Sequence, residues 1–151
     1  METRDVLGKT TIFCGLTQSE LDLVIPLCEH RRYKANEVVF AEKSKGSEIY
    51  IVKRGKVRIE VSLKGKDSAT IWRISDGDPF GELALVDRGR RSAAAICETE
   101  CELITISPDS LDQLFESHSR IGYIVMRNLG TVLAARLRKT NLQLVASILW
   151  E

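Results

Sequence analysis

The middle of the chain, from about residue 31 to residue 106, carries short apolar segments typical of β-strands. They are rich in β-branched and aromatic residues and alternate in part between apolar and polar positions. Turn signals such as Arg54-Gly55 and Asp76-Gly77 separate them. The predicted strands cover residues 37–40, 49–52, 56–61, 69–74, 92–97 and 101–106. This regular spacing predicts a small antiparallel sandwich or barrel.

A helical pattern precedes the strands. Residues 17–30 are predicted to form a helix, because Thr17 and Glu20 have the spacing of a capping box at its start. Pro26 lies inside this segment and predicts a kink or a break into two short pieces. Residues 7–13 are interpreted as another short helix or a turn.

The pattern becomes helical again after the last strand. Ser107 suits an N-cap and Pro108 suits the first helical position, so a short helix is predicted to about residue 116. A long helix is then predicted over about 120–149, where proline is absent. Together these elements predict an α+β fold that is mainly β.

The long helix repeats apolar residues at steps of mostly three or four, with a polar break at Thr140. These residues are Ile121, Val125, Leu129, Leu133, Leu137, Leu144 and Ile148. One interpretation is a helix that lies along the strands of its own subunit. The favoured interpretation is a two-helix seam in a homodimer, because a helix of this length exceeds what one small core covers.

Composition and charge narrow the class of protein. The 151 residues fit a single domain, and 44% hydrophobic and 28% charged residues are ordinary for a globular protein. The net charge of +1 does not indicate nucleic acid or a membrane as a partner. We find neither an apolar run of the roughly 20 residues that a membrane span needs nor a secretory signal. The expected location is therefore the cytoplasm, with the cysteines reduced.

Residues 80–94 carry the most specific chemistry of the chain. A glycine turn leads into Leu83-Ala84-Leu85, which is predicted to form one helical turn whose free backbone N–H groups attract an anion. The guanidinium of Arg91 can bind two phosphate oxygens at once. Glu82 is misplaced beside an anion unless it accepts a hydrogen bond from a sugar hydroxyl. A phosphate and a sugar together indicate a nucleotide.

The run Gly77-Asp78-Pro79-Phe80-Gly81-Glu82-Leu83-Ala84-Leu85, followed by Arg91-Ser92-Ala93, resembles the phosphate-binding cassette of the cyclic nucleotide-binding domain family. The chain resembles the bacterial, catabolite activator-like branch over nearly its whole length. The resemblance implies a jelly-roll-like β-barrel over 31–106, with the cassette at 77–94. N-terminal helices over about 1–30 and C-terminal helices over 107–149 are expected to flank it.

The resemblance also implies roles for individual residues. Glu82 accepts a hydrogen bond from the ribose 2′-hydroxyl, Arg91 pairs with the cyclic phosphate, and Ser92 donates to it. The implied binding residues are Gly81, Glu82, Leu83, Ala84, Arg91, Ser92, Ala93, Thr140 and Asn141. The resemblance implies that Thr140 and Asn141, on the long helix, bond to the adenine edge. It also implies that Arg136 steadies Glu82. Serine after the arginine favours cAMP, with cGMP as the second candidate.

Alternatives remain for the cassette. Glu82 and Arg91 can instead form an internal salt bridge across the loop. Arg90 stands where the family often has proline, and together with Arg88 it competes for the phosphate. The chain ends directly after the long helix, so we expect no helix-turn-helix and no DNA binding by this chain alone.

Two functions from different classes follow. The first is a cyclic nucleotide sensor whose C-terminal helix transmits binding to an unidentified effector protein. The second is a degenerate domain that serves as a dimerisation or scaffolding module without a ligand. An enzyme is not expected, because His30 and His118 are far apart and no catalytic motif or metal site is recognised. Cofactors are not expected either, and the four cysteines are interpreted as small buried hydrophobes.

Overall fold

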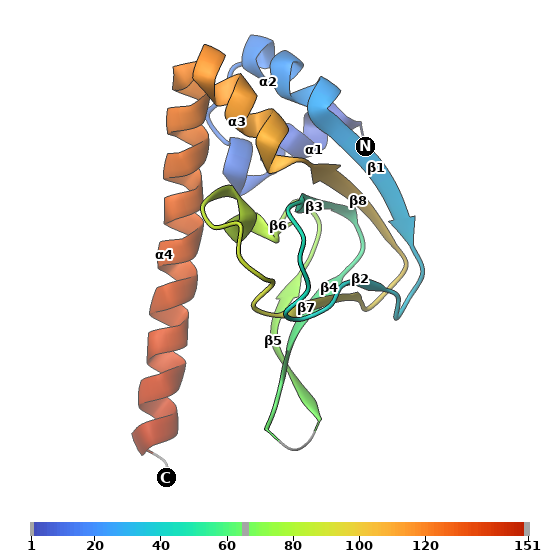
Figure 1. The fold of residues 1–151 in the computed structure, drawn as a ribbon, viewed down its shortest axis with the longest axis vertical. Helices are drawn as coiled ribbons and strands as arrows, with labels where there is room; N and C mark the ends of the chain where they lie inside the picture. Colours follow the sequence, from blue (N-terminus) through green and yellow to red (C-terminus); the bar gives the residue numbers. More distant parts are fainter. Residues whose placement is uncertain (1, 65–66, 150–151) are drawn as a thin grey trace.

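The computed structural model describes residues 2–64 and 67–149 and contains two four-stranded antiparallel sheets flanked by helices (Figure 1). The first sheet has the order β1-β8-β3-β6, formed by Cys28–Tyr33, Cys101–Ile106, Ile49–Arg54 and Pro79–Phe80. The second has the order β2-β7-β4-β5, formed by Val38–Phe40, Ala94–Cys97, Val57–Ser62 and Ser68–Ile74. The predicted α+β, jelly-roll-like fold is confirmed. The expectation that it is mainly β is wrong, because the helices hold more of the described residues than the strands do, owing to the length of the last helix.

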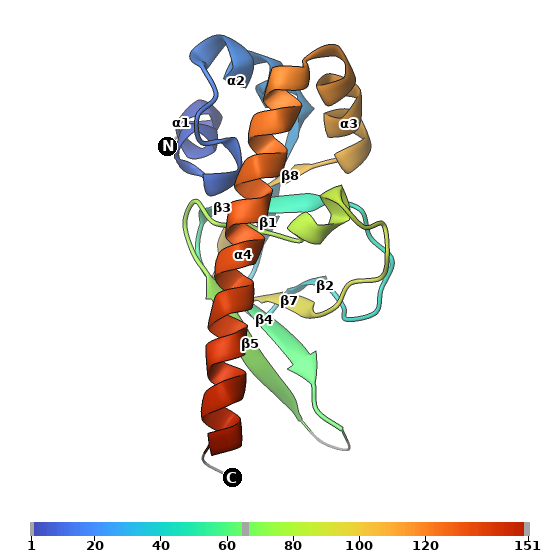
Figure 2. The ribbon, with the colours of Figure 1, turned by 90° about the vertical axis from the view of Figure 1, so that its left-hand side faces the viewer.

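The N-terminal helices and α3 (Pro108–Ser117) gather at one end of the β-roll, whereas the η3 turn (Glu82–Leu85) lies on its flank and the last helix runs past it (Figures 1 and 2). The N-terminal elements are α1 Thr3–Lys9, η1 Thr11–Phe13, α2 Gln18–Val24 and η2 Ile25–Leu27. Helix α4, Ser119–Leu149, starts among them and runs past the β-roll alongside the β4–β5 hairpin (Figures 1 and 2). The predicted long helix is confirmed.

Two apolar clusters form the core. One packs the N-terminal helices, α3 and the first half of α4 against β3 and β8, with Ile121, Val125 and Leu129 as the buried residues of α4. The other lies inside the β-roll around Tyr50 and Phe80, whose stacked rings are 5.0 Å apart between centroids. Because the first cluster covers only the first half of α4, the second half contributes no side chain to the core.

The prediction of a helix over residues 17–30 is wrong at its C-terminal end. The capping box of Thr17 and Glu20 is present, and the predicted break is confirmed, since α2 ends at Val24 and η2 follows. Residues 28–30, however, belong to strand β1, which pairs with β8 along its whole length. The strand occupies a sheet edge and exposes several polar side chains, so it lacks the apolar alternation that predicts strands. His30 therefore lies on a strand, 3.0 Å from the hydroxyl of Thr3.

The predicted strand 92–97 begins only at Ala94. Ser92 and Ala93 precede it and are left in the loop that borders the site described below. Because Ser92 and Ala93 do not pair with the strands next to β7, their polar groups are not used in the sheet and can face the site.

The cysteines are free thiols in different surroundings. Cys14 is exposed, whereas Cys97 and Cys101 are buried at the ends of β7 and β8. Burial raises the pKa of the Cys28 thiol to about 12, and burial together with the neighbouring Cys101 raises that of Cys97 to about 12. Both thiols therefore stay protonated and unreactive near neutral pH.

Within residues 2–64 and 67–149, we find no helix that is both long enough and apolar enough to span a bilayer, and no group of three or more His, Cys, Asp or Glu side chains arranged to hold a metal ion.

Candidate functional site

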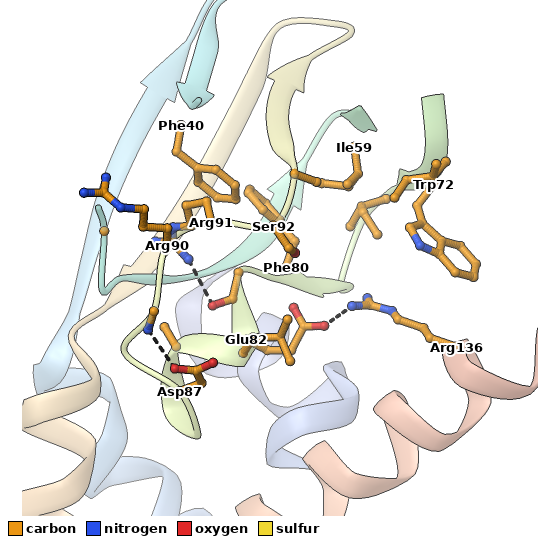
Figure 3. Close-up of a pocket in the computed structure, with 18 of the residues that line it drawn as sticks. Phe40, Ile59, Trp72, Phe80, Glu82, Asp87, Arg90, Arg91, Ser92 and Arg136 are labelled. Atoms are coloured by element: carbon orange, nitrogen blue, oxygen red, sulfur yellow. Dashed lines mark hydrogen bonds and ion pairs between the residues drawn. The ribbon is translucent and has the colours of Figure 1, made fainter. Parts of the chain in front are cut away.

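A cavity of about 340 Å³ lies between the β-roll, the η3 loop and α4 (Figure 3). Its volume is in the range of pockets that bind small molecules. One end is lined by the residues around η3 and the loop that follows, and the other by apolar side chains of β4 and β5. Leu133 and Arg136 of α4 complete the wall.

Arg91 is the buried cation of this cavity. Only 8% of the residue is exposed, and its guanidinium donates to the carbonyls of Gly81 (3.3 Å) and Glu48 (2.7 Å). The guanidinium carbon lies 4.2 Å from the ring centroid of Phe40. Its Nε has no hydrogen-bond partner, and no carboxylate of the described residues pairs with it. Burial lowers the pKa of Arg91, and the nearby Tyr50 and Glu48 act in the opposite direction.

Gly81 makes this arrangement possible. Its backbone has φ 70°, in the left-handed region, and a Cβ would lie 2.9 Å from an Arg91 nitrogen. The η3 turn starts immediately after it, with the Ala84 N–H donating to the Gly81 carbonyl at 3.3 Å. The turn directs Glu82 inward, 3% exposed, and leaves Leu83 46% exposed. A glycine is therefore required where the loop passes over the arginine.

Glu82 forms an ion pair with Arg136 of α4, not with Arg91. The alternative of a Glu82–Arg91 salt bridge is therefore wrong. Arg136 also donates to the carbonyl of Pro79 at 3.1 Å, and burial lowers its pKa. The pair joins the cassette to α4 across the cavity (Figure 3).

The other two arginines of the loop are exposed and bonded to other groups, although Arg90 also lines the cavity. Arg88 donates to the carboxylate of Asp112 on α3 at 2.7 Å. Arg90 is exposed and donates to the carbonyl of Lys43 at 2.9 Å, with its guanidinium directed away from the cavity centre (Figure 3). Among these three arginines only Arg91 is buried, which favours it as the anion-binding residue. Arg90 also lines the cavity, so its competition for an anion stays a prediction.

The structure brings most of the predicted site residues together. Those that line the cavity are Gly81, Glu82, Leu83, Ala84, Arg91, Ser92 and Ala93. Thr140 and Asn141 do not line it; both are exposed on α4, about one turn beyond Arg136.

The apolar wall was missed in the sequence. It includes Ile59, Ile71 and Trp72 from the β4–β5 hairpin, and Phe40 from β2. Their alternation marks them as strand residues, but which face of a strand borders a cavity is decided by how the sheets pack. The one signal in the sequence for this apolar wall was Trp72, an aromatic residue a few positions before the cassette.

The fold and the site define a class: a jelly-roll-like domain that holds a buried arginine beneath a glycine-led turn. The sequence model of the cyclic nucleotide-binding domain matches residues 30–118, which is more than half of the chain. The chain belongs to the cyclic nucleotide-binding domain family.

Similar proteins agree with this assignment. The chain is 32% identical over 133 residues to the cyclic AMP receptor protein of Thermus thermophilus, a match that covers 88% of the chain and 60% of that protein. It is 29% identical over 137 residues to a CRP-like cAMP-activated global transcriptional regulator of Mycobacterium tuberculosis, covering 91% and 59%. The crystal structure of Thermus thermophilus catabolite activator protein superposes with a TM-score of 0.79 at 31% identity, covering 89% of this chain and 62% of that one. The chain thus spans about 60% of the length of these relatives.

Proposed function

We propose that the chain is a regulatory domain that binds a cyclic nucleotide, with cAMP preferred. The observation that carries the proposal is the buried guanidinium of Arg91 beside a cavity of nucleotide size. Within residues 2–64 and 67–149 no carboxylate pairs with this guanidinium, and its Nε has no hydrogen-bond partner. A buried charge without a partner is costly, and a bound phosphate supplies the missing anion. Relatives named as cAMP-binding regulators support cAMP as the ligand.

The remaining cassette residues take complementary roles. The phosphate lies against Arg91, within reach of the Ser92 hydroxyl and of the backbone N–H groups of Leu83 and Ala84. Glu82 accepts a hydrogen bond from the ribose 2′-hydroxyl. This assignment explains why the carboxylate of Glu82, which is 3% exposed, lies in a site that binds an anion.

Ligand binding is coupled to α4 through Glu82. Its carboxylate is held by Arg136, so a ribose hydroxyl that bonds to Glu82 changes the environment of that ion pair. A ligand with different contacts in two positions of α4 shifts their populations. Thr140 and Asn141 lie further along the same helix, where they would meet the base in the ligand-bound arrangement.

The test of this function is isothermal titration of the protein with cAMP and with cGMP. We expect saturable one-site binding of cAMP and weaker binding of cGMP. If neither nucleotide binds at millimolar concentration, the proposal is overturned and the scaffolding alternative is favoured. If cGMP binds more tightly, the family assignment stands but the cAMP preference is wrong.

We further propose a homodimer formed through α4. The second half of the helix exposes large apolar side chains, which is unusual for a monomer. They are Leu137, Leu144, Val145 and Ile148, each at least 53% exposed. At helical spacing they share one face with Asn141, so a second α4 could cover them in a two-helix seam.

Replacing Leu144 and Ile148 by glutamate is expected to convert this dimer to a monomer, because the charges would face each other across an apolar seam. Sedimentation equilibrium measures the change. The matched control is Gln143→Glu, which adds a charge on the opposite side of α4 and should leave the dimer intact. Even a weak dimer is populated at a protein concentration of about 10⁻⁴ M. A wild-type protein that is monomeric at that concentration would contradict the proposal.

A further inference from the structure

Trp72 occupies a particular position in the cavity. It lies on β5, pairs across the hairpin with Ile59 of β4, and is partly buried against the inner core cluster. Figure 3 shows it on the side of the cavity opposite Arg91, with Glu82 between them. If the phosphate lies at Arg91 and the ribose at Glu82, the base of the nucleotide extends toward Trp72.

The end of the cavity next to Trp72 is mainly apolar and has few hydrogen-bonding groups. Its β4 and β5 wall is formed by Ile59, Ile71, Trp72 and Ile74. Aliphatic side chains recognise a ring by its apolar area, whereas an indole adds a π-face on which any base can stack.

A cation from α4 holds the indole. The Nζ of Lys139 lies 4.6 Å from the Trp72 ring centroid, within the range of a cation–π interaction. Lys139 follows Arg136 by about one helical turn, so both residues lie on the side of α4 that faces the cavity. Two contacts therefore tie α4 to the site: Arg136 to Glu82, and Lys139 to Trp72.

We propose that Trp72 is the residue of the β-roll on which the base stacks and that Lys139 is a positioning residue that fixes the indole against α4. The inference rests on the proposed nucleotide-binding function and adds a stacking residue to the base contacts proposed for Thr140 and Asn141. Because stacking accepts every base, Trp72 contributes affinity and little discrimination between adenine and guanine. Because Lys139 of α4 contacts the indole, a base that stacks on Trp72 also changes the surroundings of α4.

The first experiment measures affinity for three probes: cAMP, cGMP and the base-free ribose 3′,5′-cyclic phosphate. Trp72→Ala is expected to weaken both nucleotides by about tenfold or more and by similar factors, since stacking of one base on an aromatic ring is worth that much. Binding of the base-free probe should stay within about twofold. Trp72→Phe should keep most of the affinity, which separates the loss of a ring from a loss of folding.

The control is Arg73→Ala. Arg73 is the next residue on β5, bonds to Glu98 at 3.2 Å, and does not line the cavity. It should bind all three probes like the wild type. Nucleotide binding that requires Arg91 but is indifferent to Trp72→Ala would overturn this inference and leave the proposed function intact. Failure of the wild type to bind either nucleotide would overturn both.

The second experiment tests Lys139 by fluorescence in the ligand-free protein. The chain has two tryptophans, so Trp150→Phe leaves Trp72 as the only indole. In this background Lys139→Met is expected to shift the Trp72 emission and to weaken the nucleotides by about two- to fivefold. Arg138→Met, an exposed neighbour on α4, is the matched control. Identical emission spectra for Lys139→Met and its parent would overturn the role of Lys139.

Discussion

Replacing Arg91 by glutamine is expected to lower the affinity for cAMP by about 30-fold or more, as measured by isothermal titration. Truncating one member of a buried, hydrogen-bonded charge pair costs about 2–5 kcal/mol, and each 1.4 kcal/mol is tenfold in affinity. Arg91 is the only one of the three loop arginines that is buried in the structure as described, at 8% exposure. Its loss should therefore not be replaced by a neighbour.

The ligand-free stability of this variant should change little. Glutamine keeps a donor for the carbonyls of Gly81 and Glu48, and the substitution removes a buried charge that lacks a counterion. We expect the free energy of unfolding in urea to stay within about 1 kcal/mol of the wild type.

Arg90→Gln tests the rival cation, because Arg90 is exposed, lines the same cavity and donates to the carbonyl of Lys43. It should bind cAMP within about twofold of the wild type, since exposed charges contribute about 0–1 kcal/mol. If Arg90→Gln lost more affinity than Arg91→Gln, the assignment of the phosphate to Arg91 would be wrong.

The second large effect is expected at the ion pair between Glu82 and Arg136. Arg136→Met leaves a carboxylate that is 3% exposed without its cation, and breaking a buried pair in this way costs about 3 kcal/mol or more. Glu82→Gln should cost less, about 1 kcal/mol, because the Arg136 side chain is 27% exposed and keeps its bond to Pro79. Urea denaturation at pH 7 measures both.

The double variant Glu82→Gln/Arg136→Met completes the cycle. It should be more stable than the sum of the two single effects implies, because both members of the pair are removed together and neither charge is left without the other. The control is Arg73→Met at the pair with Glu98, whose side chains are 62% and 31% exposed, where a loss below about 1 kcal/mol is expected. Additive single effects would show that the two residues do not act as a pair.

The same variants test the coupling between ligand and helix. If Glu82 connects the ribose to α4, Arg136→Met should weaken the dependence of the α4 position on cAMP even where cAMP still binds. A spin label or fluorophore on Ser147, exposed on α4, reports that position. An unchanged ligand response in Arg136→Met would separate binding from helix movement and contradict the coupling.

Local chemistry made several elements predictable. The capping box at Thr17, the break at Pro26 and the start of α3 at Pro108 each depend on residues a few positions apart. The cassette belongs to the same category, because the left-handed backbone at Gly81 and the short η3 turn follow from local sequence. The spacing of Arg91 from this turn was enough to predict an anion site.

Strand β1 illustrates what local pattern does not contain. Its six residues, Cys28–Tyr33, form a strand because β8 supplies hydrogen-bond partners along its length. At a sheet edge the side chains need not alternate, so the segment resembled the end of a helix. The partner strand lies far along the chain, and its position is known only once the sheets are packed.

Residues close together in the chain were thus enough to predict the kind of fold, the cassette over residues 80–94 and the residue types that suit a cyclic nucleotide. The family resemblance already implied that Arg136 steadies Glu82, but the contact of Lys139 with Trp72 and the separation of Glu82 from Arg91 follow from how segments distant in sequence pack together. The physical reason is that turn and cap energies depend on neighbouring residues, whereas ion pairs and stacked rings depend on where packing places an entire helix. The packing of α4 against the β-roll therefore completes the site.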